Sequence, residues 1–196
     1  PDPIRGSYSI DPCLFKDDDG TVYAFFGGIW GGQLQWYDNN KMLKDEHLPE
    51  GKEPALPPRV VRMTDDMLQF AEPPRAVEIV DANGQPLTAD NPYRFFEASW
   101  MHKYNGRYYF SYSTGDTHYL CYAIGDNPYG PFTFQGVILD PVVGWTTHHS
   151  ILEYKGQWYL FHHDCVPSNG TTWLRSLKVM PLHYDSTGHI LRMKSE

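Results

Sequence analysis

Long hydrophobic runs and an excess of positive charge are both missing from this sequence. No run approaches the roughly 20 apolar residues that a membrane-spanning helix needs, and no charged-then-apolar signal segment opens the chain. The chain has 16 Lys and Arg residues against 24 Asp and Glu residues, for a net charge of -8. This balance argues against a nucleic acid or a membrane as partner. It leaves neutral ligands open, and the cellular compartment stays undetermined.

Cysteine is also scarce. The 3 cysteines, Cys13, Cys121 and Cys165, are an odd number without metal-type spacing, so we expect buried, unpaired thiols rather than a disulfide scaffold. Glycine (17) and proline (16) are plentiful, which predicts many turns and few long helices. Aromatic residues make up 15% of the 196 residues, as suits one large domain of β-sheets or a carbohydrate-stacking surface.

The most informative stretch is residues 95–112, FFEASWMHKYNGRYYFSY. It predicts two strands joined by a tight Asn-Gly turn, the strongest short-range hairpin signal. One carboxylate, Glu97, stands at the entrance between Phe95 and Trp100. Apolar walls disfavour the charged form and raise the pKa of a carboxyl group. We therefore interpret Glu97 as a candidate proton donor, the alternative being an exposed acid at a strand end.

Two further hairpins, at residues 9–28 and 148–163, repeat this pattern. When the hairpins are aligned on the turn glycine, Asp11 and Glu97 occupy the same position, nine residues ahead of it. His149 lies seven residues ahead of the glycine in the third hairpin. Repeats of this kind indicate an array of similar sheets, so residues that open different sheets can face one cavity.

The spacing of the repeats is typical of a β-propeller. The turn glycines of the second and third hairpins are fifty residues apart, the size of a propeller blade. The middle blade is expected to continue with strands at residues 119–124 and 132–138, and the last blade with strands at 173–179 and 183–185. The first blade is expected to carry a long insertion, about residues 31–94.

The insertion is less regular than the rest of the chain. Residues 38–58 are polar and rich in proline, which predicts a surface loop. Residues 60–63 and 76–80 are candidates for short strands.

Four segments resemble glycoside hydrolase family 43: SIDPCLFKDDDG (9–20), FFEASWMHKYNGRYYFSYSTGD (95–116), YAIGDNPYGPF (122–132) and WTTHHSILEYKGQWYLFHHD (145–164). The resemblance runs from about residue 9 to residue 190. It implies an all-β, five-bladed β-propeller enzyme, either a β-xylosidase or an α-L-arabinofuranosidase. Such an enzyme would remove terminal xylose or arabinose from xylo- or arabino-oligosaccharides of plant hemicellulose. The matches account for about three of five blades, so residues 1–196 are expected to be the C-terminal blades of the catalytic domain.

The resemblance also implies roles for individual residues. Glu97 matches the general acid, and Asp11, in an Ile-Asp-Pro motif, matches the residue that orients the acid and tunes its pKa. His149 matches a central histidine beside a calcium ion that is held largely through waters. Arg175 resembles an arginine that hydrogen-bonds sugar hydroxyls. The general base lies on a blade outside the match, so missing N-terminal blades, from a longer chain or another subunit, are expected to supply it.

The chemistry explains the need for several carboxylates. Inverting hydrolysis uses a protonated acid beside the leaving oxygen and a carboxylate that activates water, roughly 6.5–9.5 Å away. The negative charge of Asp11 is expected to raise the pKa of Glu97, as the aromatic walls do.

Several of these candidates have structural alternatives. The aromatic residues Trp30, Phe95 and Trp100 could stack on sugar, or they could be core residues of strands. Arg175 could lie on an outer strand, away from any pocket. His149 could be a buried core histidine, and its neighbour His148 is not expected at the site because side chains alternate along a strand.

A second class of function also fits the sequence. A non-catalytic propeller that binds carbohydrate or another partner would keep the same fold, since a fold does not determine an activity. A propeller that lacks blades cannot close its ring, so the 196-residue chain alone is expected to be poorly active.

Overall fold

The computed structural model describes residues 10–145 and 147–195 of the chain. Strands dominate among these residues, and the helical structure that they contain is confined to three short 3-10 turns. The strands are β1 (Cys13–Lys16), β2 (Val22–Phe26), β3 (Tyr37–Asp38), β4 (Lys41–Met42), β5 (Arg59–Arg62), β6 (Arg75–Ala76), β7 (Ile79–Val80), β8 (Phe95–Tyr104), β9 (Arg107–Thr114), β10 (Leu120–Gly125), β11 (Phe132–Leu139), β12 (His149–Tyr154), β13 (Gln157–Asp164) and β14 (Ser176–Leu182); the 3-10 turns are η1 (Trp30–Gly32), η2 (Leu34–Trp36) and η3 (Val166–Ser168). No helix in the described part of the chain has the length and apolar character needed to cross a membrane.

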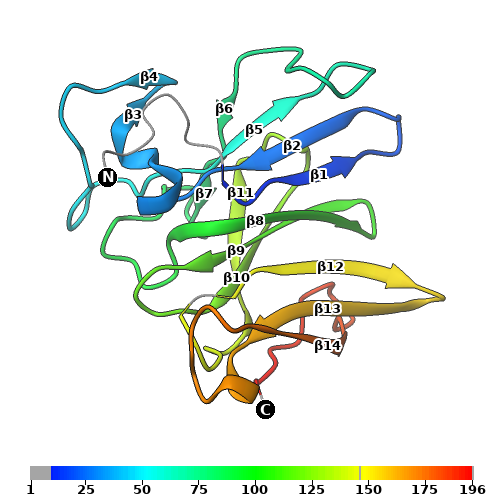
Figure 1. Ribbon diagram of the computed structural model, residues 1–196. Helices are drawn as coiled ribbons and strands as arrows, with labels where there is room; N and C mark the ends of the chain where they lie inside the picture. Colours follow the sequence, from blue (N-terminus) through cyan, green and yellow to red (C-terminus); the bar gives the residue numbers. More distant parts are fainter. Residues whose placement is uncertain (1–9, 146, 196) are drawn as a thin grey trace.

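The strands form three main sheets that follow one another along the chain. The first sheet has the order β1-β2-β5-β6, the second β8-β9-β10-β11-β7 and the third β12-β13-β14, while β3 and β4 form a small hairpin. Figure 1 shows the three sheets side by side, with β8 between β1 and β12. β1, β8 and β12, an edge strand of each sheet, are therefore neighbours.

The three predicted hairpins are confirmed as β1/β2, β8/β9 and β12/β13. In the β8/β9 turn, Asn105 and Gly106 have φ angles of 47° and 76°. Positive φ at both central residues gives the turn whose twist matches the flanking strands. The strands expected in the middle blade are confirmed as β10 and β11.

The insertion in the first blade is shorter than the predicted residues 31–94. The candidate strand at 60–63 corresponds to β5, which pairs with β2. The candidate at 76–80 is split into β6, which pairs with β5, and β7, which pairs with β11 of the second sheet. β5 and β6 are the third and fourth strands of the first sheet, so the excursion between β2 and β5 occupies residues 27–58. Pairing between strands so distant along the chain depends on tertiary contacts, which the local pattern does not reveal.

The third sheet also differs at its end. Its third strand, β14, begins at Ser176, three residues later than the expected segment at 173–179. The expected strand at 183–185 is reduced to an isolated bridge between Tyr184 and Ile190.

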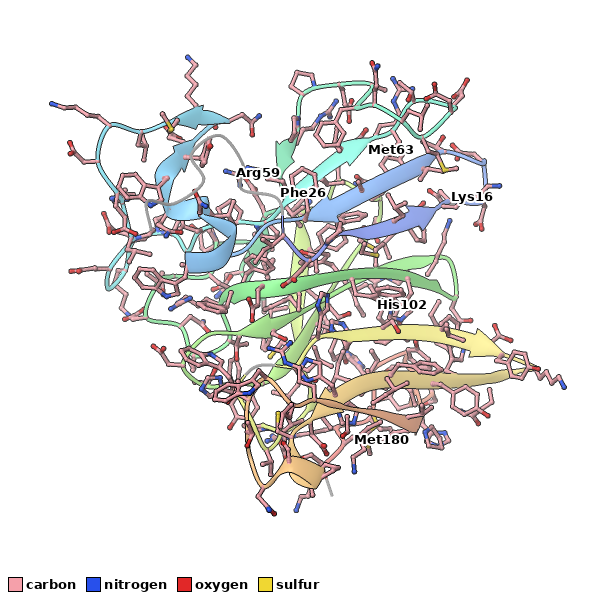
Figure 2. The ribbon with its side chains drawn as sticks, viewed as in Figure 1. Lys16, Phe26, Arg59, Met63, His102 and Met180 are labelled. Carbon is pink, nitrogen blue, oxygen red and sulfur yellow. The ribbon has the colours of Figure 1, made fainter. Side chains whose placement is uncertain are left out.

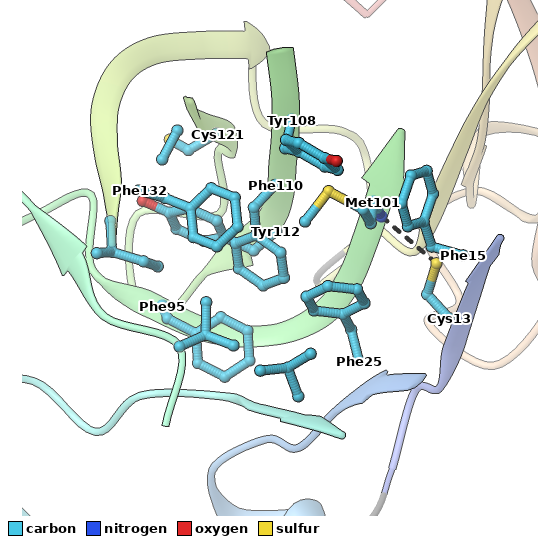
Figure 3. Close-up of a cluster of buried hydrophobic side chains, with 14 of the residues drawn as sticks. Cys13, Phe15, Phe25, Phe95, Met101, Tyr108, Phe110, Tyr112, Cys121 and Phe132 are labelled. Atoms are coloured by element: carbon cyan, nitrogen blue, oxygen red, sulfur yellow. Dashed lines mark hydrogen bonds between the residues drawn. The ribbon is translucent and has the colours of Figure 1, made fainter. Parts of the chain in front are cut away.

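The first core lies between the first and second sheets (Figure 3). Phe25 of β2 and Phe110 of β9 are fully buried there, with ring centroids 5.8 Å apart. Cys13 contributes from β1, and its Sγ accepts a hydrogen bond from the Met101 amide at 3.4 Å. All three cysteines are buried and unpaired, as predicted.

The second core lies between the second and third sheets. Alternation along β9 sends Tyr108 and Phe110 to the first core and Tyr109 to the second. Leu160 of β13 is fully buried on the opposing side. His102 of β8 lies between these two sheets (Figure 2), in ring contact with Tyr109. The second sheet is thus buried on both faces, which explains its nearly continuous apolar strands.

Candidate active site

Asp11 contacts residues at the beginning of the other two sheets. Asp11 lies two residues before β1, and its Oδ2 accepts a hydrogen bond from the Ala98 amide of β8 at 3.1 Å. Its Oδ1 lies 3.5 Å from Nδ1 of His148, just before β12. One carboxylate therefore touches the first strand of the second sheet and the entrance to the third.

The backbone at Asp11 is strained. Its φ is 52°, in the left-handed region, which non-glycine residues seldom occupy, although aspartate tolerates it better than most. Strained residues of this kind gather at functional sites, where the surrounding structure holds them in place. Here the hydrogen bond to the Ala98 amide supplies such a restraint.

Glu97 owes its direction to a β-bulge in β8. The register of β8 against β9 shifts between Phe95 and Glu97, and again between Glu97 and Trp100. Ala98, inside this irregular stretch, has a φ of 62°. A bulge re-aims side chains by interrupting the strict alternation of a strand. The adjacent residues Phe96 and Glu97 can therefore both line the same cleft.

A glycine-rich loop packs directly against Glu97. The Ile29 amide donates a hydrogen bond to the Phe96 carbonyl at 3.0 Å. A Cβ on Gly28 would lie 2.7 Å from Ile10 Cδ1 and 3.2 Å from Glu97 Cβ. A side chain at position 28 would crowd Ile10 and Glu97, so glycine favours this close approach of the loop to the strand that carries Glu97.

The cleft at Glu97 has a volume of about 450 Å³. Of the residues predicted from sequence, Glu97, Trp30 and Arg175 line it together, from three separate parts of the chain. Asp11 adjoins Glu97 through the Ala98 amide. The complete lining is Ile29, Trp30, Gly31, Phe96, Glu97, Trp145, Thr172 and Arg175.

Two indole rings flank the cleft. Trp30 is 55% exposed and Trp145 is 58% exposed. The Trp30 backbone has a φ of 59°, and its amide donates to Oε1 of the buried Gln35 at 3.1 Å. Exposed indoles beside a carboxylate suit stacking on a sugar ring. Sequence reasoning missed Trp145 and Thr172, although Trp145 opens the fourth matched segment, WTTHH.

Arg175 lies immediately before β14, exposed at the cleft. Its Nε donates to the Thr172 carbonyl at 3.1 Å, and its Nη1 lies 3.4 Å from Nε2 of His163. Burial and the nearby Arg175 charge lower the pKa of His163 to about 4. His163 is therefore neutral near pH 7, and Arg175 keeps further donors for a ligand.

Phe95 and Trp100 are placed away from the cleft lining. Phe95 is 2% exposed in the first core and borders a separate apolar cavity of about 140 Å³. Trp100 is half-buried, and its Nε1 donates to the Ile151 carbonyl at 3.1 Å across to the third sheet. The positions of Phe95 and Trp100 fit core packing rather than stacking on a sugar.

His149 is buried between the second and third sheets. Its Nε2 lies 2.7 Å from the Ser111 hydroxyl, and its Nδ1 is buried without a hydrogen-bond partner. Burial, reinforced by the nearby His148, His102 and His162, holds the pKa of His149 well below its usual range. His149 therefore stays neutral, the form in which a histidine nitrogen can bind a metal or accept from water.

The metal site expected at His149 can be tested against its surroundings. Among the described residues, no three His, Cys, Asp or Glu side chains are grouped so as to hold a metal ion. Calcium takes six to eight oxygen ligands, which these side chains do not offer directly. The free Nδ1 of His149 fits an ion only through the ion's own water shell.

His148 was not expected at the site, yet it contacts Asp11. The alternation argument fails because β12 begins at His149, so His148 precedes the strand. The His148 amide donates to Nε2 of His163 at 3.0 Å, which fixes its position. The sequence shows the two adjacent histidines, but it does not show that β12 begins between them.

Known proteins match this chain along nearly its whole length. The model of glycosyl hydrolases family 43 matches residues 2–190. A β-xylosidase from Xylanibacter ruminicola is 80% identical over 98% of this chain and 60% of its own length. A xylosidase/arabinosidase from Bacteroides ovatus is 68% identical over 99% of this chain and 60% of its own length. The chain thus spans about 60% of the curated relatives that it matches.

Solved structures superpose closely on this chain. The structure of the RS223 β-xylosidase has a TM-score of 0.94 at 67% identity, covering 98% of this chain and 60% of that protein. A compost-metagenome β-xylosidase/α-arabinofuranosidase, CoXyl43, was solved with xylotriose in a calcium-free form; its TM-score is 0.91 at 56% identity, covering 98% of this chain and 60% of that one. The chain therefore belongs to glycosyl hydrolase family 43, and its three sheets are blades of a partial, five-bladed type of β-propeller.

Proposed function

We propose that the protein containing this chain is a glycosidase that removes terminal xylose or arabinose from hemicellulose oligosaccharides. The observation that carries the proposal is Glu97 in an open cleft, next to a second carboxylate, Asp11, held by the adjoining Ala98 amide. The names of the relatives, β-xylosidase and xylosidase/arabinosidase, support the same substrate class.

In the proposed mechanism, Glu97 is the general acid. Its proton passes to the glycosidic oxygen as the bond to the anomeric carbon breaks. A water molecule attacks the opposite face of the sugar, so the configuration inverts. Asp11 orients Glu97 and favours its protonated form through its negative charge.

The remaining lining residues bind the sugar. Trp30 and Trp145 offer indole faces for stacking, and the Arg175 guanidinium offers hydrogen bonds to hydroxyls. The carboxylate that activates water is assigned to no residue of this chain. It would come from the part of the relatives that the chain does not span, supplied by a longer chain or another subunit.

Calcium has a limited place in this proposal. If an ion binds, a water of its hydration shell would contact His149 Nδ1, and the ion would supply positive charge there. One relative, CoXyl43, was solved with xylotriose in a calcium-free form.

The test is Glu97→Gln in the full-length protein. We expect the rate on xylobiose to fall at least about 100-fold, because general acid catalysis typically contributes 10²–10⁴-fold. The loss on 4-nitrophenyl xyloside should be smaller, since nitrophenolate leaves with little help from an acid. Glu153→Gln is the matched control, because Glu153 is exposed on β12 away from the cleft lining.

Two outcomes would contradict the proposal. Equal turnover of xylobiose by the wild type and Glu97→Gln would remove Glu97 from the chemistry. Binding of xylotriose by the wild-type protein in calorimetry, without any hydrolysis, would favour the non-catalytic carbohydrate-binding propeller. NMR of the first product checks the mechanism: a β-xyloside should release α-xylose.

A further inference from the structure

We propose that His148 is a positioning residue for Asp11, holding its carboxylate where it can serve Glu97. This inference rests on the proposed function and adds a residue to it. His148 touches Asp11 rather than the cleft lining, so it would act through Asp11.

The two oxygens of Asp11 have different partners. Oδ2 accepts from the Ala98 amide at 3.1 Å, and Oδ1 lies 3.5 Å from His148 Nδ1. A carboxylate held at one oxygen can still turn about its side-chain bonds, whereas contacts at both oxygens define its plane. His148 therefore completes the restraint that the Ala98 amide begins.

His148 is itself held from two sheets. Its amide donates to His163 Nε2 at 3.0 Å. The preceding residue, Thr147, accepts a hydrogen bond from the Ser113 hydroxyl through its carbonyl and donates from its own hydroxyl to the His163 carbonyl at 2.8 Å. The segment that presents the imidazole is thus fixed between β9 and β13.

The same contacts lead from Asp11 to the cleft. His163, which accepts from the His148 amide, lies 3.4 Å from Arg175 Nη1. Arg175 lines the cleft with Glu97. The histidine pair His148 and His163 therefore joins Asp11 of the first sheet to the cleft residue before β14. A displacement of about 1 Å in such a constellation can reduce turnover strongly.

The position of Asp11 makes this restraint consequential. Its backbone is strained, with a φ of 52°, and its side chain is 24% exposed. Without His148, water could compete for Oδ1, and the carboxylate could rotate relative to Glu97. The substrate pocket would keep its lining while the acid lost its neighbour.

The test uses the full-length protein and xylobiose. His148→Phe keeps the bulk of the ring and removes the nitrogen, so we expect kcat to fall about tenfold or more with KM within about twofold. His148→Asn places an amide nitrogen near the position of Nδ1, and it should restore most of the lost kcat. His183→Phe is the control, since His183 is exposed beyond the end of β14. Melting temperatures confirm that each variant folds.

A double-mutant comparison separates indirect from direct action. If His148 acts through Asp11, adding His148→Phe to Asp11→Asn should cost little further kcat. Additive losses, an unchanged kcat in His148→Phe, or a rise in KM alone would overturn the inference. So would an Asn variant no better than the Phe variant.

A structural readout keeps the inference independent of the proposed function. In a crystal structure of His148→Phe, the Asp11 carboxylate should leave the Ala98 amide or turn about its plane. An unmoved carboxylate would overturn the positioning role even in an active enzyme. Failure of the wild type to cleave xylobiose would instead contradict the proposed function, and the crystal structure would still decide the role of His148.

Discussion

At the scale of single residues, the buried histidines matter most for behaviour in solution. His102 stacks on Tyr109 with ring centroids 5.0 Å apart, and its Nε2 lies 2.8 Å from the Tyr184 hydroxyl. Burial lowers the pKa of His102 to about 3. The folded protein therefore keeps this ring neutral at pH values where an exposed histidine is charged.

Protonation of His102 should weaken the fold in acid. The folded-state pKa lies below the ordinary value of 6.5, so the unfolded chain binds the proton first as the pH falls. Stability contributed by neutral His102 is full above about pH 6.5 and is lost progressively toward about pH 3. His102→Gln should therefore flatten the loss of unfolding free energy between pH 7 and pH 4.5, measured by urea unfolding.

The control for this measurement is His47→Gln, because His47 is exposed in the loop after β4. Its stability should follow the wild-type pH dependence. An identical slope for His102→Gln and the wild type would show that His102 does not carry the acid sensitivity.

At the scale of elements, the bulge in β8 decides where Glu97 points. A regular strand would send Phe96 and Glu97 to opposite faces, yet both line the cleft. The left-handed φ of 62° at Ala98 and its hydrogen bond to Asp11 belong to the same irregularity. The bulge therefore links the direction of the acid to the position of its neighbour.

Substitution at Ala98 tests the bulge. Ala98→Val places a β-branched residue at positive φ in a site that is 1% exposed; we expect a cost of about 1–3 kcal/mol and a fall in kcat. Ala98→Gly tolerates the same φ and should stay within about 1 kcal/mol of the wild type. Thermal unfolding and xylobiose turnover of the full-length protein measure both effects.

Ala76→Val supplies the comparison, since Ala76 is exposed on β6 and makes no contact with the cleft. If Ala98→Val is as stable and as active as Ala76→Val, the bulge is not needed to aim Glu97.

At the scale of the whole molecule, the third sheet presents an apolar outer face. Leu177 and Val179 of β14 are 72% and 50% exposed, and Leu174 just before the strand is 56% exposed. Alternation puts Leu177 and Val179 on the same side of β14. Leu14 of the first sheet and Phe70, in the segment between β5 and β6, are also exposed apolar side chains. Faces of this kind usually meet another part of a protein.

The isolated 196-residue chain should therefore be prone to self-association and have low activity. We expect it to self-associate in sedimentation velocity experiments and to turn over xylobiose far more slowly than the full-length protein. The double variant Leu177→Lys/Val179→Lys should reduce self-association of the isolated chain without restoring activity. A monomeric isolated chain with full-length turnover would refute this prediction.

The hairpins could be predicted because their signals are local, and the candidate site residues were identified from the same short stretches. The Asn105-Gly106 turn and the repeated spacing of Asp11 and Glu97 are properties of short stretches of sequence, as are the strands β8 and β9. Membership of the family follows from the same stretches. The extent of the first sheet was misjudged because β5 pairs across the excursion with β2.

By itself, the sequence determined the all-β class, the three hairpins and the candidate acid at Glu97, because strand periodicity and turn chemistry act between near neighbours. The tertiary structure alone decided which side chains meet. It brought Trp145 and Arg175 to the cleft, left Phe95 in the core and set His148 against Asp11. These placements depend on a bulge, on where strands begin and on how sheets pack, and such long-range geometry leaves little mark on local sequence.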